Sequence, residues 1–311
     1  MNEQAKLIIG TRGSQLALWQ ARETKRLLYQ AHPQLTDDMV QLKVITTTGD
    51  RIQDRALAAA GGKGLFTKEI EESLADGSIH MAVHSMKDMP TTLPDGMVMS
   101  CILEREDPRD AFISNVAGRI ADLKSGATVG TASLRRQAQL LHARPDLNVV
   151  TYRGNVQTRL KKLDEGVVDA TFLANAGLIR LGLGERITSL IDTDEMLPAV
   201  AQGAIGVETR ADDEETINYL RPLNHLRTEQ AIGAERAMLA ALDGSCRTPI
   251  AGLAIIDEAG HMTFRAEITM PDGSKRHVTD RAGSAEDFHA LGLDAGEELK
   301  RRAGPEFLAA I

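Results

Sequence analysis

Residues 7–14, LIIGTRGS, read as a short strand that turns directly into a helix beginning near Gln15. Residues 127–136, ATVGTASLRR, repeat the pattern with a strand, hydroxyl side chains and two arginines. Each junction places free backbone N–H groups at a helix N-terminus, where the helix dipole and the unpaired donors attract an anion. Arginine at this end of a helix opposes the dipole, so its appearance at both junctions predicts a ligand rich in carboxylate or phosphate.

The composition indicates a globular protein of two or three domains. The chain has 311 residues, of which 42% are hydrophobic and 26% charged. Aromatic residues make up only 3% and the net charge is −8, so we expect no nucleic-acid partner. The first residues carry no apolar run and no segment is long enough to cross a membrane. With only Cys101 and Cys246 there is no disulfide framework, and we expect a cytoplasmic protein.

Strand and helix patterns alternate through most of the chain. Strands are predicted at 6–10, 40–46, 79–84 and 97–103, and helices at 14–31 and 64–76. Further strands at 127–130, 147–152 and 168–173 alternate with helices at 133–143, 155–165 and 175–182. This alternation is typical of mixed sheets with helices on both faces. A helix over 229–242, two strands at 250–256 and 262–269, and a helix near 285–302 predict a small C-terminal α+β domain.

Arginine is concentrated in the middle of the chain. Nine arginines and three lysines occur between Arg105 and Arg180. The planar guanidinium group binds carboxylate or phosphate through two hydrogen bonds, which a lysine cannot do. A single arginine is more often part of a solvated face, but several at the carboxyl ends of strands favour a ligand site.

Three other segments carry groups that could take part in chemistry. Residues 84–90, HSMKDMP, follow a buried strand, and a lysine beside Asp88 suits acid–base work as well as it suits a plain turn. Cys246 lies in a loop beside an arginine, which favours a reactive or ligand-tethering thiol, with a passive cysteine as the more common alternative. His80 and His84 lie on a strand, where ordinary structural histidines are favoured over a metal site.

These motifs together, in this order, resemble the porphobilinogen deaminases, also called hydroxymethylbilane synthases. The matching stretches are 11–18, 61–66, 82–88, 104–110, 130–136, 153–159, 176–182, 197–203 and the loop around Cys246. They cover almost the whole chain. Ala132, Ser245 and Arg247 stand where many relatives have other residues.

The resemblance implies two α/β domains with the fold of periplasmic solute-binding proteins and a third, α+β domain. Their expected ranges are 1–104 with 200–222, 105–199, and 223–311. It also implies a dipyrromethane cofactor, attached to Cys246 through a thioether. On this primer the enzyme, a transferase, condenses four porphobilinogen molecules head to tail with loss of ammonia. Hydrolysis then releases the linear tetrapyrrole.

The family's functional residues carry over to matching positions of this chain. Asp88 is the expected catalytic acid, which stabilises positive charge on pyrrole nitrogen. The expected cofactor- and substrate-binding residues are Arg12, Ser14, Lys63, Ser85, Lys87, Thr131, Ser133, Arg135, Arg136, Arg153, Gly154, Arg159 and Arg180. Lys63 lies on a glycine-rich loop that could act as a lid. No metal is expected, porphobilinogen is the expected small-molecule partner, and we expect a monomer.

Two other functions use some of the same features. A non-enzymatic two-lobed binding protein for an anionic solute would share the architecture, although it would not need Cys246. A phosphate-ester enzyme would use the arginines, but the chain lacks a P-loop and a plausible metal site.

Overall fold

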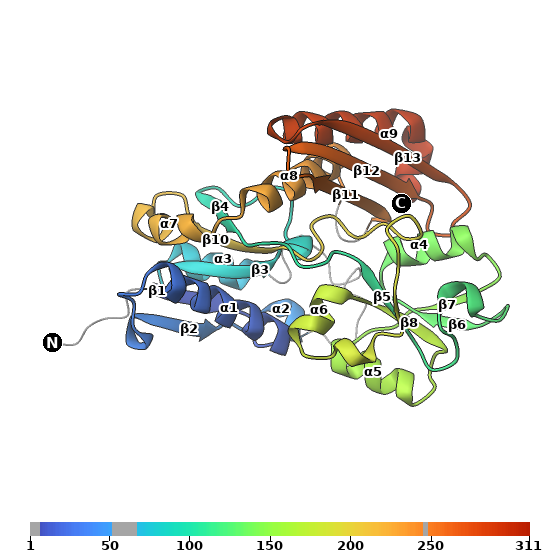
Figure 1. Ribbon diagram of the computed structural model, residues 1–311, viewed down its shortest axis with the longest axis horizontal. Coiled ribbons are helices and arrows are strands. Elements are labelled where there is room, and N and C mark those ends of the chain that lie inside the picture. Colours follow the sequence, from blue (N-terminus) through green and yellow to red (C-terminus); the bar gives the residue numbers. More distant parts are fainter. Residues whose placement is uncertain (1–6, 52–66, 245–247) are drawn as a thin grey trace. The chain divides into compact units, whose positions relative to one another are not determined.

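The computed structural model describes residues 7–51, 67–244 and 248–311 (Figure 1). Within it the chain divides into two compact units. Unit 1 consists of Met1–Arg105 and Ala204–Glu229, and unit 2 consists of Glu106–Gly203 and Gln230–Ile311. The chain therefore leaves unit 1 after Arg105 and returns to it at Ala204.

Unit 1 is built on one five-stranded sheet in the order β2-β1-β3-β10-β4. The strands are β1 (Leu7–Thr11), β2 (Val40–Val44), β3 (Met81–Ser85), β4 (Met97–Ile102) and β10 (Ile205–Arg210). β2, β1 and β3 run parallel, and β10 lies antiparallel between β3 and β4. The helices are α1 (Gln15–Ala31), α2 (Thr48–Arg51), α3 (Lys68–Ala75) and α7 (Glu214–Leu220).

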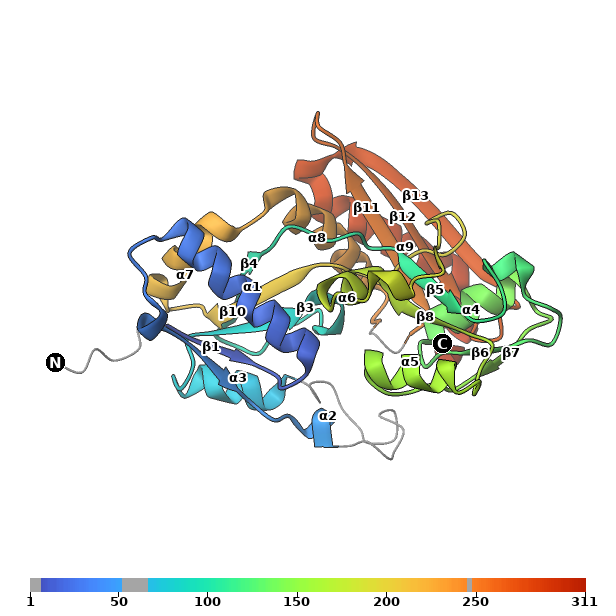
Figure 2. The ribbon, with the colours of Figure 1, turned by 60° about the horizontal axis from the view of Figure 1, so that its bottom comes forward.

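Alternating side chains of the unit 1 strands form two cores, one on each face of the sheet. Leu7 and Ile9 of β1 pack with Ala21 and Leu28 of α1. Ile8, between them, packs on the other face with Ile70 and Leu74 of α3. Figure 2 shows α1 and α3 on opposite sides of β1. Because successive side chains of a strand point to opposite faces of the sheet, α1 packs on one face and α3 on the other.

Unit 2 contains a second sheet with the same arrangement, in the order β7-β6-β8-β5-β9. Its strands are β5 (Asp110–Ser114), β6 (Thr128–Gly130), β7 (Asn148–Val150), β8 (Ala170–Ala174) and β9 (Ser189–Leu190). β7, β6 and β8 are parallel, while β5 is antiparallel to β8 and β9. The helices are α4 (Leu134–Ala143), α5 (Val156–Asp164) and α6 (Asn175–Arg180). In both sheets, the antiparallel fourth strand follows directly after a crossing between units.

The rest of unit 2 is a three-stranded antiparallel sheet, β11-β12-β13, with two helices. These are β11 (Ile250–Ile256), β12 (His261–Thr269), β13 (Arg276–Ser284), α8 (Leu226–Ala241) and α9 (Phe288–Ala310). α9 lies along the sheet and contacts β12 and β13 (Figure 1). It is kinked at Gly304, whose φ of 76° is non-helical, immediately before Pro305.

Short 3-10 helices complete the described structure. They cover Asp37–Met39, Met86–Asp88, Ile120–Asp122, Gly184–Arg186, Arg221–Leu223 and Ala285–Asp287.

The predicted mixed α/β sheets flanked by helices and the small C-terminal α+β part are confirmed. The predicted strands and helices occur within a few residues of their expected bounds, and α9 extends beyond residue 302. The sequence analysis missed β5, β9, β10, β13, α2 and α7, and it expected two strands rather than three in the C-terminal sheet. The predicted boundaries of three domains stay a prediction, since the described chain separates into two units.

Candidate functional site

Unit 1 has a pocket where β1 and β3 end. Its volume is about 90 Å³, and its lining includes Arg12, Ser14, Gln20, His84, Ser85 and Asp88. β1 and β3 are parallel neighbours, so the residues that follow them lie at the same edge of the sheet. The structure thus brings together four residues that the sequence analysis singled out separately, namely Arg12, Ser14, Ser85 and Asp88.

Local hydrogen bonds fix the two segments that line this pocket. Ser14 is the N-cap of α1, and its hydroxyl accepts a hydrogen bond from the Ala17 N–H at 3.2 Å. Gln20, one turn further along α1, donates from Nε2 to the Ser85 hydroxyl at 2.8 Å. Asp88 is exposed at the end of the 3-10 helix, and Lys87 beside it is half-buried. The hydrogen bond between Gln20 and Ser85 therefore fixes the position of α1 relative to the end of β3.

One residue of the pocket lining, His84, has a buried partner that the sequence analysis did not connect with it. His84 Nε2 lies 2.9 Å from Glu208 Oε2, and their side chains are 6% and 0% exposed. Glu208 belongs to β10, 124 residues further along the chain, so no local pattern could link the two. For His80, the Ile8 N–H donates to Nδ1 at 3.0 Å. Both histidines thus have structural partners, as the sequence analysis favoured.

Unit 2 gathers arginines at the carboxyl ends of β6 and β7. Burial, together with the nearby cations Arg136 and Arg153, lowers the pKa of Arg159 to about 10. Arg159 Nε donates to the Gly154 carbonyl at 2.8 Å, within the loop that leads into α5. An anion beside such a cluster of cations would be stabilised by their charges. This part of unit 2 therefore has the electrostatics of a carboxylate or phosphate site.

Arg135 and Arg136 are largely engaged by the protein itself. Both donate to Asp110, at 2.7 and 2.8 Å, and all three side chains are at most 6% exposed. Arg135 also donates to the Leu197 carbonyl and Arg136 to the Phe172 carbonyl. Burial opposes ionisation of Asp110, but the two guanidinium groups outweigh it and hold its pKa well below the usual range. Within the described part of the chain, the buried Nε atoms of both arginines have no hydrogen-bond partner.

The remaining predicted residues of unit 2 occupy loop and helix-start positions. Ser133 is the N-cap of α4, and its backbone N–H donates to the Thr131 hydroxyl at 3.1 Å. The Thr131 N–H donates to the Val150 carbonyl at the end of β7. This backbone donor is therefore used within the protein. Arg180, 9% exposed, donates to the Gly203 carbonyl at 2.6 Å. Lys63 and Cys246 lie outside the described residues.

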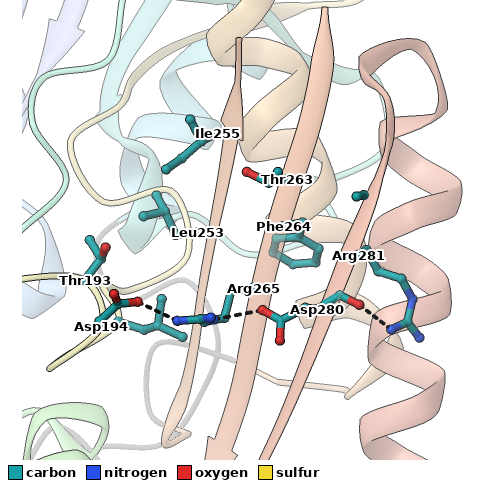
Figure 3. A pocket seen from close by; sticks show the side chains of 11 residues that line it. Thr193, Asp194, Leu253, Ile255, Thr263, Phe264, Arg265, Asp280 and Arg281 are labelled. Atoms are coloured by element: carbon teal, nitrogen blue, oxygen red, sulfur yellow. Dashed lines mark hydrogen bonds and ion pairs between the residues drawn. The ribbon is translucent and has the colours of Figure 1, made fainter.

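A larger pocket of about 450 Å³ opens elsewhere in unit 2, on the C-terminal sheet (Figure 3). The Arg265 side chain lies between Asp194 and Asp280, at 2.6 and 2.8 Å, and Leu253 and Ile255 cover another part of the lining. The described residues that line it include none of the predicted site residues.

No helix in the described part of the chain is long and apolar enough to cross a membrane. The described residues also contain no group of three or more His, Cys, Asp or Glu side chains placed to hold a metal ion.

Two family models match the chain. Residues 7–218 match "Porphobilinogen deaminase, dipyromethane cofactor binding domain", and residues 230–301 match "Porphobilinogen deaminase, C-terminal domain". The chain belongs to the porphobilinogen deaminase family. This confirms the resemblance found in the sequence. The model of the cofactor-binding domain covers most of unit 1 and the 106–203 part of unit 2.

Curated relatives agree with this assignment. The chain is 55% identical to the chloroplastic porphobilinogen deaminase of Pisum sativum, over 98% of this chain and 84% of that protein. It is 54% identical to the chloroplastic enzyme of Oryza sativa subsp. japonica, over 97% and 86%.

Solved structures with a related backbone are more distant. A putative methionine-binding lipoprotein from Bacillus subtilis has a TM-score of 0.44 and 13% identity, over 71% of this chain and 90% of that chain. The aliphatic sulphonate binding protein SsuA from Escherichia coli has a TM-score of 0.41 and 15% identity, over 78% and 71%. These likenesses carry no argument about what this chain binds.

Proposed function

We propose that this protein is a porphobilinogen deaminase, a transferase of tetrapyrrole biosynthesis. It condenses four porphobilinogen molecules head to tail on a dipyrromethane primer, releases ammonia at each addition, and frees the linear tetrapyrrole by hydrolysis. The match of both family models, over 7–218 and 230–301, carries this proposal. The geometry of the two units agrees with it.

The described residues fit a polycarboxylate cofactor and substrate. Each porphobilinogen unit carries an acetate and a propionate, so the ligand is strongly anionic. Arg153 and Arg159 form the cation cluster that such a ligand would stabilise, and the unpartnered Nε–H groups of Arg135 and Arg136 are further donors. The other residues of unit 2 proposed to bind the cofactor and substrate are Thr131, Ser133, Gly154 and Arg180.

Unit 1 supplies the groups for the chemical step. Asp88, exposed in the pocket, stabilises the positive charge that develops on pyrrole nitrogen as ammonia leaves. Arg12, Ser14 and Ser85 bind substrate carboxylates or the pyrrole N–H. Lys87 contacts the acidic side chains of the cofactor, and Lys63, outside the described residues, is a further expected binding residue. When bound, the dipyrromethane provides the nucleophilic carbon to which the first unit is joined.

The thioether to Cys246 is tested by intact-mass analysis of protein from cells that make porphobilinogen. We expect an added mass of two linked pyrroles in the wild type and none in Cys246→Ser. Cys101→Ser is the matched control. Its thiol is 1% exposed, and burial raises its pKa to about 12, so it forms little thiolate. A wild-type protein without added mass would contradict the proposed function, and a two-lobed solute-binding protein would give that result.

The monomeric state, the cytoplasmic location and the boundaries of three domains remain predictions. The relatives from Pisum sativum and Oryza sativa are chloroplastic by name.

A further inference from the structure

His84 is held against a buried carboxylate at the back of the pocket that contains Asp88. Its Nε2 lies 2.9 Å from Glu208 Oε2, and Glu208 is fully buried in the middle of the unit 1 sheet. β10 and β3 pair in register here, Gly206 opposite His84 and Glu208 opposite Ala82. The pairing of the two strands places both side chains in one buried region, and turning the ring away would leave the buried Glu208 carboxylate without this hydrogen bond.

The charged groups around this pair include more carboxylates than cations. Glu71 of α3 lies close enough for its pKa to respond to both members. Burial raises that pKa, Glu208 raises it further, and His84 lowers it. On the pocket side, Asp88 and Arg12 complete the titratable and charged groups that share this lining. Within the described chain, Glu208 Oε1 and Glu71 Oε1 are buried without a hydrogen-bond partner.

We infer that His84, oriented by Glu208, is a second catalytic residue, which accepts the proton released when a new pyrrole is joined. This inference rests on the proposed function. With Glu208 ionised, Nε2–H donates to its carboxylate, and Nδ1 is the ring atom that can take up a proton. Any exchange between the ring and a group in the pocket must then pass through Nδ1.

The coupling of a new pyrrole forms one carbon–carbon bond and breaks two other bonds to carbon. A carbon–carbon bond forms between the aminomethyl carbon of porphobilinogen and the free α-carbon of the terminal pyrrole, after the carbon–nitrogen bond to ammonia has broken with its electron pair on nitrogen. The C–H bond at the α-carbon then breaks. Its electron pair restores the aromatic ring, and the proton moves to Nδ1 of His84. Asp88 stabilises the positive charge on pyrrole nitrogen. One residue thus stabilises charge and another accepts the proton.

His84→Gln is the variant that separates proton transfer from structure. A glutamine amide can still donate to Glu208, but it cannot take up a proton near neutral pH. We expect each ring addition, followed by intact mass in single-turnover experiments, to slow by about 10²–10⁴-fold. The rising limb of the wild-type pH–rate profile should be missing in His84→Gln, because this variant has no base at the position. His80→Gln, a histidine four residues earlier and outside the pocket lining, should keep both rate and pH profile.

A readout independent of turnover is the tautomer of the ring. In protein labelled with ¹⁵N-histidine, the His84 signal, assigned by its loss in His84→Gln, should show hydrogen on Nε2 and none on Nδ1 in the neutral form. Glu208→Gln should shift this tautomer balance. A neutral ring protonated on Nδ1, or a His84→Gln variant with wild-type rate and pH profile, would overturn the inference. Neither result affects the proposed function, which stands on the covalently added mass in the same wild-type sample.

Discussion

The arginines of unit 2 differ in whether a carboxylate of the protein pairs with them. The Arg135 and Arg136 guanidinium groups share the buried carboxylate of Asp110. The charged groups that act on Arg159 include the cations Arg136 and Arg153 instead. We therefore expect a ligand carboxylate to gain most from Arg153 and Arg159, because no carboxylate of the described residues pairs with them as Asp110 pairs with the other two. Sequence alone could not separate these roles, since residues 110 and 135 meet only through the fold.

At the same scale, Asp88→Ala tests the expected catalytic acid. We expect the covalent primer to be retained while turnover falls by about 10²–10³-fold, because a group that stabilises developing charge has been removed. Asp95→Ala, an exposed carboxylate just before β4, is the matched control and should turn over normally. Steady-state rates with intact-mass analysis measure both quantities. Turnover equal to wild type in Asp88→Ala would remove this residue from its proposed role.

Most of the unit 1 site was predictable one residue at a time. Arg12, Ser14, Ser85 and Asp88 all follow the carboxyl ends of apolar strands, and that rule places them together. Glu208 was not predictable, because its strand arrives after the chain has passed through unit 2. Gln20 was missed for another reason: a polar residue within a helix gives no signal that it faces a neighbouring strand.

Among the elements, the loop between β7 and α5 depends on one glycine. Gly154 has φ of 132°, and a Cβ atom there would lie 2.8 Å from the Thr158 side chain. This loop carries Arg153, and Asn155 caps α5 by accepting a hydrogen bond from the Thr158 N–H. The conformation of the glycine thus sets both the start of the helix and the place of Arg153, a proposed ligand-binding residue.

Gly154→Ala should therefore destabilise the protein by about 1–3 kcal/mol through backbone strain and the contact with Thr158. The control is Gly166→Ala at the end of α5. This glycine also has a positive φ, of 73°, but no atom would lie within 4 Å of the new Cβ. Thermal unfolding should show the larger loss in Gly154→Ala. Equal losses would mean that the contact with Thr158 relaxes without cost.

The elements found from sequence are those with strong local signals. α1, α4 and α5 begin after Ser14, Ser133 and Asn155, whose side chains cap them. The missed strands lack the pattern of apolar residues by which a strand is recognised from its own sequence. β5 begins inside a run of charged residues, and β13, RHVTDRAGS, has hardly any apolar residues to mark its buried face. Their place in the sheets is set by the partner strands rather than by their own sequence.

For the molecule as a whole, Asp110 is the point where distant parts of unit 2 meet. It begins β5, accepts hydrogen bonds from two residues of α4, and accepts another from Gln202 Nε2 at 2.8 Å. Arg135 and Gln139 of α4 both donate to the Leu197 carbonyl. The outgoing and returning segments of the chain are thereby tied to the same helix.

Asp110→Asn should destabilise unit 2 by about 3–5 kcal/mol, because it leaves two buried guanidinium groups with no counter-charge. The native pKa of Asp110 lies below that of the unfolded chain, about 3.9. Its stabilising effect is therefore complete above the unfolded value and is lost as pH falls towards the native value. Melting temperatures measured from pH 7 to pH 3 should fall more steeply for wild type than for Asp110→Asn. Parallel curves would contradict this assignment.

The position of β10 between β3 and β4 has a consequence for how the protein is made. The sheet of unit 1 is incomplete until Ile205–Arg210 has left the ribosome, because that strand joins two strands synthesised more than a hundred residues earlier. Until then β3 and β4 each present an open edge of the kind that promotes aggregation. The strands of the β5–β9 sheet all precede residue 204, so that sheet can form during this interval. The N-terminal unit of this protein is thus begun first and finished second.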